Sequence, residues 1–322
     1  STVGEHLVNP DCATQDSAAE LYYAKQQAFA LLPFITLAMA FIFWFLVGKI
    51  QKQHFFDKRK EADETTSKDK YIVTMTNLLY LLYPTLCTNA FSLFDCKVVG
   101  QKLYLKASMD VECYVDKHFN MMLIFGFGQI ILYVGGLPMV VFYFVYRNRT
   151  KLNSHVVLAR YGLFFGAYKP SRFFWEIVIT FRKVGVVALT VFGPEMGPEM
   201  QTQVALLLLL ICIVFEIYGD PFAEKTSRHK ILGWLEISSL LVEWWTMWSG
   251  LMIYQLDKNN QIGVILSVSV IIFNTALLLW FAVQFIRATI HEKKEAKLAA
   301  LQSNHKKKKS FLSNSLSSLR KR

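Results

Sequence analysis

The chain has 322 residues, of which 53% are hydrophobic, 15% are aromatic and 18% are charged, and its formal net charge is +11. A soluble protein of this length carries about a quarter charged residues, so this composition predicts an integral membrane protein. The 16 Gly, 8 Pro and 5 Cys exclude a collagen-like chain and a small disulfide scaffold, and the hydrophobic content excludes a disordered chain. The basic residues are sorted along the chain by membrane side rather than gathered in one patch, so we expect no nucleic-acid partner.

Residues 1–27 precede the first long apolar stretch and are predicted to form an extracellular N-terminal segment. The sequence opens Ser-Thr-Val-Gly, without an initiator Met or a signal-like segment. We interpret this opening as the end of a larger ectodomain. Cys12 has no evident partner on this side, and we expect its partner upstream.

Seven stretches are long and apolar enough to cross a bilayer as helices. A hydrocarbon core about 30 Å thick takes roughly 20 helical residues, because a helix satisfies its own backbone groups where lipid offers no partner. The predicted fold class is therefore an all-α integral membrane protein with a seven-transmembrane-helix bundle over residues 28–286. The predicted spans are 28–48, 71–94, 119–146, 173–192, 202–218, 232–254 and 262–286.

The Lys and Arg residues of the connections predict the orientation of this bundle. With the N-terminus outside, 27 of the 35 basic residues fall in cytoplasmic segments and 6 in outer segments. Cytoplasmic segments carry the excess of Lys and Arg in membrane proteins. We therefore predict an outer N-terminus and a cytoplasmic C-terminus, with residues 287–322 forming a basic cytoplasmic tail.

Polar and small residues mark the second and third predicted spans. A stripe of Asn77, Thr85 and Asn89 in the second span can line a wet path, but such residues also bond across packed helices, and we favour packing. In the third span the stretch Gly126-Phe127-Gly128, followed by Gln129, indicates a close backbone approach rather than the alternative, a selectivity filter. Pro138 predicts a kink there, since proline removes an amide donor and clashes with the preceding turn.

Two cysteines, Cys96 and Cys113, share the outer connection between the second and third spans. An oxidising compartment favours a bridge between them, and closing this loop of about 18 residues would contribute roughly 3 kcal/mol. The alternative is two free thiols. Cys87 and Cys212 lie inside spans and are expected to be packing residues. No cysteine spacing resembles a metal site, and no cofactor is expected.

Ionisable residues inside the predicted spans are the candidate functional residues, since each is costly in lipid unless it faces protein or water. At 1.5 Å per residue, Arg182 lies about 14 Å deep, near mid-bilayer. We expect Arg182 or Lys183 to pair with Glu243, and the remaining acidic residues to form a group nearer the cytoplasm. A static ion-pair network and a gated ion path or charge sensor both fit this pattern. The full set is Glu176, Arg182, Lys183, Glu216, Glu236 and Glu243.

Two cytoplasmic segments are predicted to contact lipid. Residues 156–174 mix basic and aromatic side chains in a way that is typical of a helix lying on the inner leaflet. Lys306, Lys307, Lys308 and Lys309 can hold the tail to anionic lipid, at about 1 kcal/mol per basic group. Phosphorylation of the adjacent Ser310 would weaken that contact. The alternative is a solvated, disordered tail.

No nucleophile and base are spaced for hydrolysis, and neither a Walker loop nor a dinucleotide fingerprint is present, so we expect no enzyme. Seven spans with an outer N-terminus also describe G-protein-coupled receptors. The third span ends in Tyr146-Arg147-Asn148-Arg149, however, rather than in an acidic-Arg-aromatic triplet, and the seventh has no Asn-Pro pair.

A set of short motifs resembles the TRP-like (transient receptor potential-like) C-terminal membrane modules of large protist and algal surface proteins. These modules are distantly similar to fungal TRP-like channels. The motifs are Leu82-Tyr83-Pro84, Phe94-Asp95-Cys96, Tyr104-Leu105, Asp110 to Cys113 with His118, Gly136-Leu137-Pro138, Arg160-Tyr161-Gly162, Tyr168-Lys169-Pro170, Trp175-Glu176, Arg182-Lys183, Tyr218 with Asp220-Pro221-Phe222, and Leu235-Glu236 with Ser239-Leu240.

The resemblance implies a cation channel or channel-like subunit in the plasma, flagellar or surface membrane, oligomeric if it conducts. The four acidic residues of the spans would then shape a cation route beside Arg182 and Lys183. The alternative function is a non-conducting seven-helix anchor or receptor that holds an extracellular assembly. Inner-leaflet lipids are expected partners in both cases.

Overall fold

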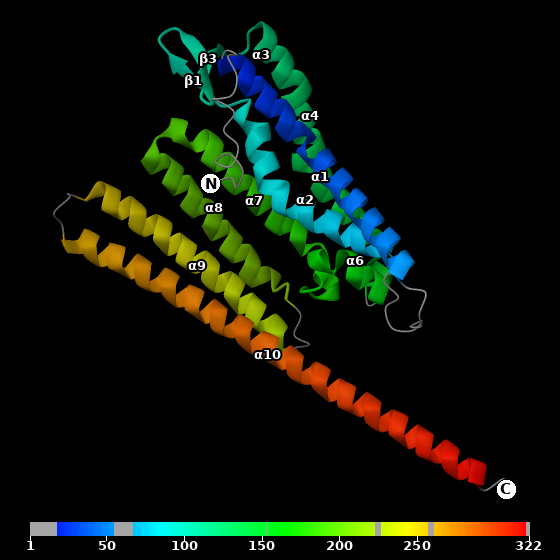
Figure 1. The fold of residues 1–322 in the computed structure, drawn as a ribbon. Coiled ribbons are helices and arrows are strands. Elements are labelled where there is room, and N and C mark those ends of the chain that lie inside the picture. Colours follow the sequence, from blue (N-terminus) through cyan, green and yellow to red (C-terminus); the bar gives the residue numbers. More distant parts are fainter. Residues whose placement is uncertain (1–17, 55–66, 153, 223–226, 257–260, 320–322) are drawn as a thin grey trace. The chain divides into compact units, whose positions relative to one another are not determined.

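Helices make up most of the protein in a computed structural model that describes residues 18–54, 67–152, 154–222, 227–256 and 261–319 (Figure 1). The chain divides into two compact units, Ser1–Lys225 and Thr226–Arg322. Cys12 and most of the N-terminal segment lie outside the described residues.

Two long helices, α1 (Ala18–His54) and α2 (Ser67–Ser92), run side by side in the first unit (Figure 1). The Gln26 side-chain amide donates to the Asn89 carbonyl oxygen at 2.7 Å, and the Trp44 indole donates to the Thr74 hydroxyl at 3.0 Å. Helix α1 begins ten residues before the predicted span, because residues 18–27 are mostly helix formers. The described end of the predicted N-terminal segment is therefore helical.

A small antiparallel sheet follows α2 in the predicted outer connection, for which the all-α prediction included no strand. Its strands β1 (Cys96–Val99), β2 (Lys102–Leu105) and β3 (Ser108–Glu112) pair in the order β1-β2-β3. The sheet packs on α1, where Tyr23, Leu105 and Val111 are buried in one cluster. We call residues 95–118 the disulfide cap.

The third predicted span is a run of α3 (Asp116–Met121), η2 (Met122–Gly126), α4 (Phe127–Gln129), η3 (Ile130–Gly136) and α5 (Leu137–Arg147). Segments η2 and η3 are π-helical, and Pro138 stands in the first turn of α5. A π-helical segment lies directly before Pro138, as expected where a proline interrupts the helical ladder, and the predicted kink stays a prediction.

The remaining helices of the first unit include two, α6 (His155–Phe165) and α7 (Trp175–Phe192), that pack against α2. Helix α6 also packs on α5 and α7, and α7 continues through η6 (Gly193–Met196) into α8 (Pro198–Gly219). Two short 3₁₀ segments, η4 (Arg149–Lys151) and η5 (Pro170–Arg172), flank α6. The predicted interfacial stretch thus contains one short helix with three helical neighbours, and its contact with lipid stays a prediction.

The second unit contains α9 (Ser227–Gln255) and α10 (Gln261–Leu319), which pack against each other. The Trp245 indole donates to the Ser269 hydroxyl at 3.1 Å and the Asn274 amide to the Thr246 hydroxyl at 3.0 Å. The backbone of residues 306–309 is part of α10. The contact of these four lysines with lipid stays a prediction.

Five of the seven predicted spans fall within a helix or the run of helical segments. The remaining two each extend two residues beyond a helix: span 71–94 passes the end of α2 at Ser92, and span 173–192 begins before α7 at Trp175. Within the described residues, five helices are both long and apolar enough to cross a bilayer: Ala19–Ile50, Lys117–Arg147, Trp175–Met196, Pro198–Gly219 and Gln261–His291. The other two spans correspond to α2 and α9, which have 26 and 29 residues but lower mean hydropathy because more of their residues are polar.

Candidate functional site

A cavity of about 400 Å³ lies between α2, α5, α6 and α7 in the first unit. Its wall is almost entirely aliphatic and aromatic, with the charged groups of Glu176 and Lys183 on the α7 side. Ile72, Met75 and Leu79 contribute from α2, and Val141 and Phe144 from α5. A largely apolar cavity with few polar groups is the usual form of a small-molecule site, which makes it the candidate site.

The two charges pair within one helix. Glu176 and Lys183 are two turns apart on α7, and the Lys183 Nζ lies 3.6 Å from the Glu176 Oε1. The ammonium also donates to the Tyr80 hydroxyl of α2 at 2.5 Å and lies 3.9 Å from the centroid of that ring. Lys183 therefore joins α7 to α2 through a cation–π contact and a hydrogen bond.

Glu176 is held from a second direction. The Tyr168 hydroxyl donates to the Glu176 Oε2 at 2.8 Å, while the Oε1 accepts no hydrogen bond within the described part of the chain. Glu176 is only 8% exposed. The cavity wall thus contains a buried carboxylate oxygen beside a cation, with one acceptor position unused.

The segment before α7 is fixed by the end of α8. Tyr168 forms an antiparallel bridge with Phe222, the Lys169 amide donates to the Pro221 carbonyl oxygen at 2.7 Å, and Lys169 pairs with Asp220. Asp220 caps α8 in the left-handed region at φ 38°, which Asp tolerates better than most residues. Two of the motifs from the sequence analysis, Tyr168-Lys169-Pro170 and Asp220-Pro221-Phe222, therefore meet at one seam.

The same seam holds Glu216. The Trp175 indole donates to the Glu216 Oε2 at 3.1 Å, and Glu216 is 4% exposed. The ring packs directly over Gly219, where an added Cβ would lie 1.9 Å from the Trp175 ring carbon Cη2. Only glycine fits under that ring.

The predicted cluster is therefore divided between the two units. Glu176 and Glu216 accept from different donors, Tyr168 and Trp175, and the acidic group predicted for them with Glu236 stays a prediction. Arg182 stands on α7 next to Lys183. Glu236 and Glu243 lie on α9 in the second unit, so the predicted pairing of Glu243 with Arg182 or Lys183 stays a prediction.

The polar stripe of α2 forms bonds within its own helix. The Asn89 side chain donates to the Thr85 carbonyl oxygen at 2.9 Å, and the backbone of Asn89 accepts from Gln26 of α1. Asn77 is exposed on α2. The contacts of Asn89 fit the packing interpretation.

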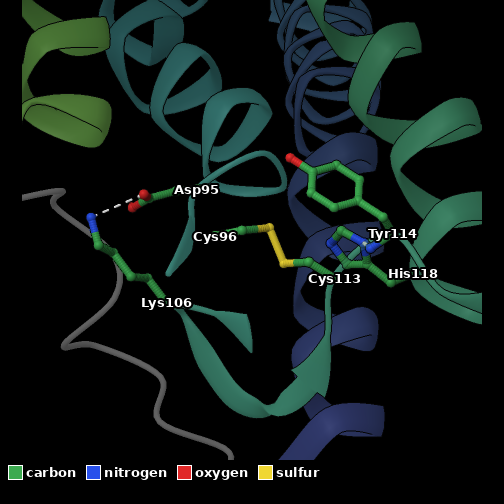
Figure 2. The surroundings of a disulfide bond; sticks show 6 residues. All are labelled: Asp95, Cys96, Lys106, Cys113, Tyr114 and His118. Carbon is green, nitrogen blue, oxygen red and sulfur yellow. Dashed lines mark hydrogen bonds and ion pairs between the residues drawn. A yellow bond between two sulfur atoms is a disulfide. The ribbon is translucent and has the colours of Figure 1, made fainter. Parts of the chain in front are cut away.

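The predicted disulfide is confirmed. Cys96 at the start of β1 is bonded to Cys113 just after β3, which closes the disulfide cap (Figure 2). Next to it, the Lys106 ammonium lies 3.0 Å from the Asp95 Oδ1 and 2.9 Å from the Glu195 Oε1 of η6. The cap is thereby tied to the connection between α7 and α8.

His118 lies beside the disulfide (Figure 2). Its Nδ1 accepts from the Tyr114 backbone amide at 3.0 Å, and the residue is 1% exposed. The two cysteine sulfurs and a His118 nitrogen lie within 4.8 Å of one another. Metals bind cysteine as thiolate, however, and the sulfurs are joined here, so we assign no metal to this group.

Sequence reasoning missed Tyr80, Tyr168 and Lys106 as partners of the charged residues. Tyr80 precedes Lys183 by 103 positions, and no spacing pattern connects residues so far apart. Tyr168 could have been found, because it is the first residue of the motif Tyr168-Lys169-Pro170 and an aromatic hydroxyl is a common partner of a buried carboxylate.

Comparison with known proteins gives one partial similarity. The chain is 26% identical over 178 residues to cysteine repeat modular protein A of Toxoplasma gondii. The match covers 49% of this chain and 6% of that protein, so this chain corresponds to a small fraction of its relative's length. No family model matches the chain, and no solved structure matches it.

Proposed function

We propose that this chain is a non-conducting, seven-helix membrane module that anchors a larger extracellular assembly. Five long apolar helices support the membrane location, and α2 and α9 complete the seven spans. The similarity to a small fraction of a much longer modular protein supports a module that works as part of a larger assembly. The surface membrane is the proposed location.

The observation that carries the proposal is that each of two carboxylates expected to form an ion route has one oxygen bonded to an aromatic side chain of its own unit. Glu176 accepts from Tyr168 and pairs with Lys183, and Glu216 accepts from Trp175. A conducting path needs carboxylate or carbonyl oxygens that face water and replace the hydration of an ion. Carboxylates already bonded to side chains of their own unit serve helix packing instead.

The topology with an outer N-terminus is part of the proposal. It places the Cys96–Cys113 bond of the disulfide cap in an oxidising compartment, where such bonds persist. It also leaves most of the basic residues on the cytoplasmic side. Labelling of engineered single cysteines at residues 99 and 292 in intact cells tests it, and we expect modification from outside at the first position alone.

A flux assay tests whether the module conducts. The purified 322-residue chain is reconstituted in liposomes that contain a K⁺- or Ca²⁺-sensitive dye, over a range of protein-to-lipid ratios. We expect cation entry at the rate of empty liposomes at every ratio. Selective entry that rises steeply with that ratio, and that Glu176→Gln abolishes, would overturn the proposal.

A cation channel is the second candidate, and one observation favours it. The Oε1 of Glu176 has no hydrogen-bond donor within the described residues and lies in a cavity wall. An oxygen of this kind can coordinate a cation when further subunits complete a path. Glu216→Gln is the matched variant in the flux assay, because Glu216 is a buried carboxylate that does not line the cavity and a route past Glu176 does not depend on it.

A further inference from the structure

The cavity beside Glu176 is open on the α5 side. Val140 and Phe144 line it and are 52% and 39% exposed, so a molecule in the surrounding apolar phase can reach it without crossing the packed interior. Its volume of about 400 Å³ lies low in the range of roughly 300–1,000 Å³ that small-molecule sites span. This size favours one hydrocarbon body over a lipid with two acyl chains.

The polar edge of the cavity selects the headgroup. The Glu176 Oε1 is a buried acceptor without a hydrogen bond in the described chain, which is unfavourable unless a ligand or water donates to it. Lys183 lies 3.6 Å from that oxygen, so the carboxylate charge is already balanced. A charged headgroup would leave an uncompensated charge there, whereas a neutral hydroxyl adds the missing donor at no electrostatic cost.

We propose that this cavity binds a lipid with one hydrocarbon body and a neutral hydroxyl head, such as a sterol or a monoacylglycerol. The hydroxyl donates to the Glu176 Oε1 and turns its own oxygen toward the Lys183 ammonium. The hydrocarbon lies along Leu79 of α2 and Val141 of α5. The inference rests on the membrane location within the proposed function but not on the absence of conduction.

Photo-crosslinking of the full chain in liposomes tests the site. A diazirine-bearing sterol and a diazirine-bearing monoacylglycerol are used in separate arms, and labelled peptides are mapped by mass spectrometry. We expect labels on the cavity-lining parts of α2, α5 and α7 in at least one arm, and the arm that labels identifies the lipid type. Labels spread evenly over all exposed apolar helix faces in both arms would overturn the proposal.

Competition with unlabelled lipids tests the hydroxyl. The O-methyl ether of the same lipid keeps the hydrocarbon but cannot donate, so the parent lipid should compete roughly tenfold better than the ether, as expected for one hydrogen bond to a charged acceptor. Equal competition would refute the assigned hydrogen bond. Glu176→Gln should reduce the preference to about threefold, because a neutral acceptor forms a bond about half as strong.

Matched variants separate the cavity from general effects. Glu216→Gln alters a buried carboxylate that does not line the cavity and should keep the tenfold preference. Ile177→Trp fills the cavity and should abolish site labelling, whereas Ile131→Trp, on a surface position that is 73% exposed, should not. Formation of the Cys96–Cys113 bond, read on a non-reducing gel, confirms folding of each variant.

The flux assay on the same liposomes distinguishes this inference from the proposed function. Cation flux together with site labelling would refute the anchor and leave the lipid site standing. Sealed liposomes without site labelling would refute the lipid site and leave the anchor standing.

Discussion

The hydroxyl of Tyr83 donates a hydrogen bond of 2.8 Å to the carbonyl oxygen of Val134, in the π-helical segment before Pro138. Pro138 has no amide hydrogen, so it cannot donate to the carbonyl four residues earlier, which belongs to Val134. Tyr83 on α2 is 6% exposed and supplies a donor to that carbonyl. The irregular turn of the third span is therefore stabilised by a neighbouring helix.

Replacing Tyr83 with Phe should lower the free energy of unfolding by about 1–2 kcal/mol, because a buried carbonyl oxygen loses a donor while the ring remains in place. The measurement is reversible unfolding in mixed detergent micelles. Tyr143→Phe is the matched control, since Tyr143 is 54% exposed on α5 and should change stability by less than about 0.5 kcal/mol. Equal losses in the two variants would contradict the role given to Tyr83.

Gly126 and Gly128 form a matched pair for testing the contact of the third span with Phe94, which follows the end of α2. A Cβ on Gly126 would lie 2.9 Å from the Phe94 ring, whereas a Cβ on Gly128 meets nothing within 4 Å. Gly126→Ala should therefore destabilise the protein by about 1–3 kcal/mol, as expected for overpacking. Gly128→Ala should be neutral or stabilising by up to about 1 kcal/mol, because Ala is the better helix former. Thermal unfolding followed by circular dichroism checks both.

The Cys96–Cys113 bond should contribute about 3 kcal/mol to the stability of the disulfide cap. The double variant Cys96→Ser and Cys113→Ser should increase proteolysis between β1 and β3 without altering the α9–α10 unit. Limited proteolysis with peptide mapping measures this difference. Added Zn²⁺ should not protect the oxidised wild-type protein, because its sulfurs are not thiolates; protection by Zn²⁺ would contradict the assignment of a purely structural bond.

Lys106 should make part of the stability dependent on alkaline pH. Burial lowers the pKa of Lys106, but its hydrogen bonds to Glu195 and Asp95 outweigh this effect and raise the pKa above its ordinary value. A raised pKa in the folded state stabilises the protein below the unfolded-state pKa of about 10.4, and this contribution disappears as the pH rises through the folded-state value.

Lys106→Met should therefore cost about 1 kcal/mol at pH 8 and much less above about pH 11. The measurement is the free energy of unfolding of the wild-type protein and of Lys106→Met at both pH values. At each pH the difference between the two proteins removes the contribution of the other titrating groups. Lys97→Met, an exposed lysine on β1, is the control and should show no such pH dependence. A loss that is equal at both pH values would contradict the ion-pair origin.

Much of the helical architecture follows from local properties of the sequence. Three apolar stretches, around Ala40, Ile213 and Leu278, are longer than the uniformly apolar stretches found in helices of soluble proteins. Their composition alone therefore predicts helices that suit a bilayer. The bond between Cys96 and Cys113 was predictable for a similar reason, because the two residues are close in sequence and share one connection.

The sheet of the disulfide cap was less predictable. Its strands have only four or five residues each, too few for an alternating pattern to stand out. The π-helical turns also carry no local signal beyond Pro138 and its two preceding glycines.

The partners of the buried charges were decided by tertiary structure alone. The sequence identifies Lys183 as a charge inside an apolar stretch, where it is costly unless it has a partner. It does not show that the partner is the hydroxyl of Tyr80 on another helix. Likewise, the sequence predicts that Glu216 is a buried carboxylate. Its hydrogen bond from Trp175, however, depends on how α7 and α8 pack at Gly219. The sequence shows that a charge inside an apolar helix needs a partner, because an unpaired buried charge is unfavourable. Which side chain is that partner depends on distances between helices, and these are set only by tertiary packing.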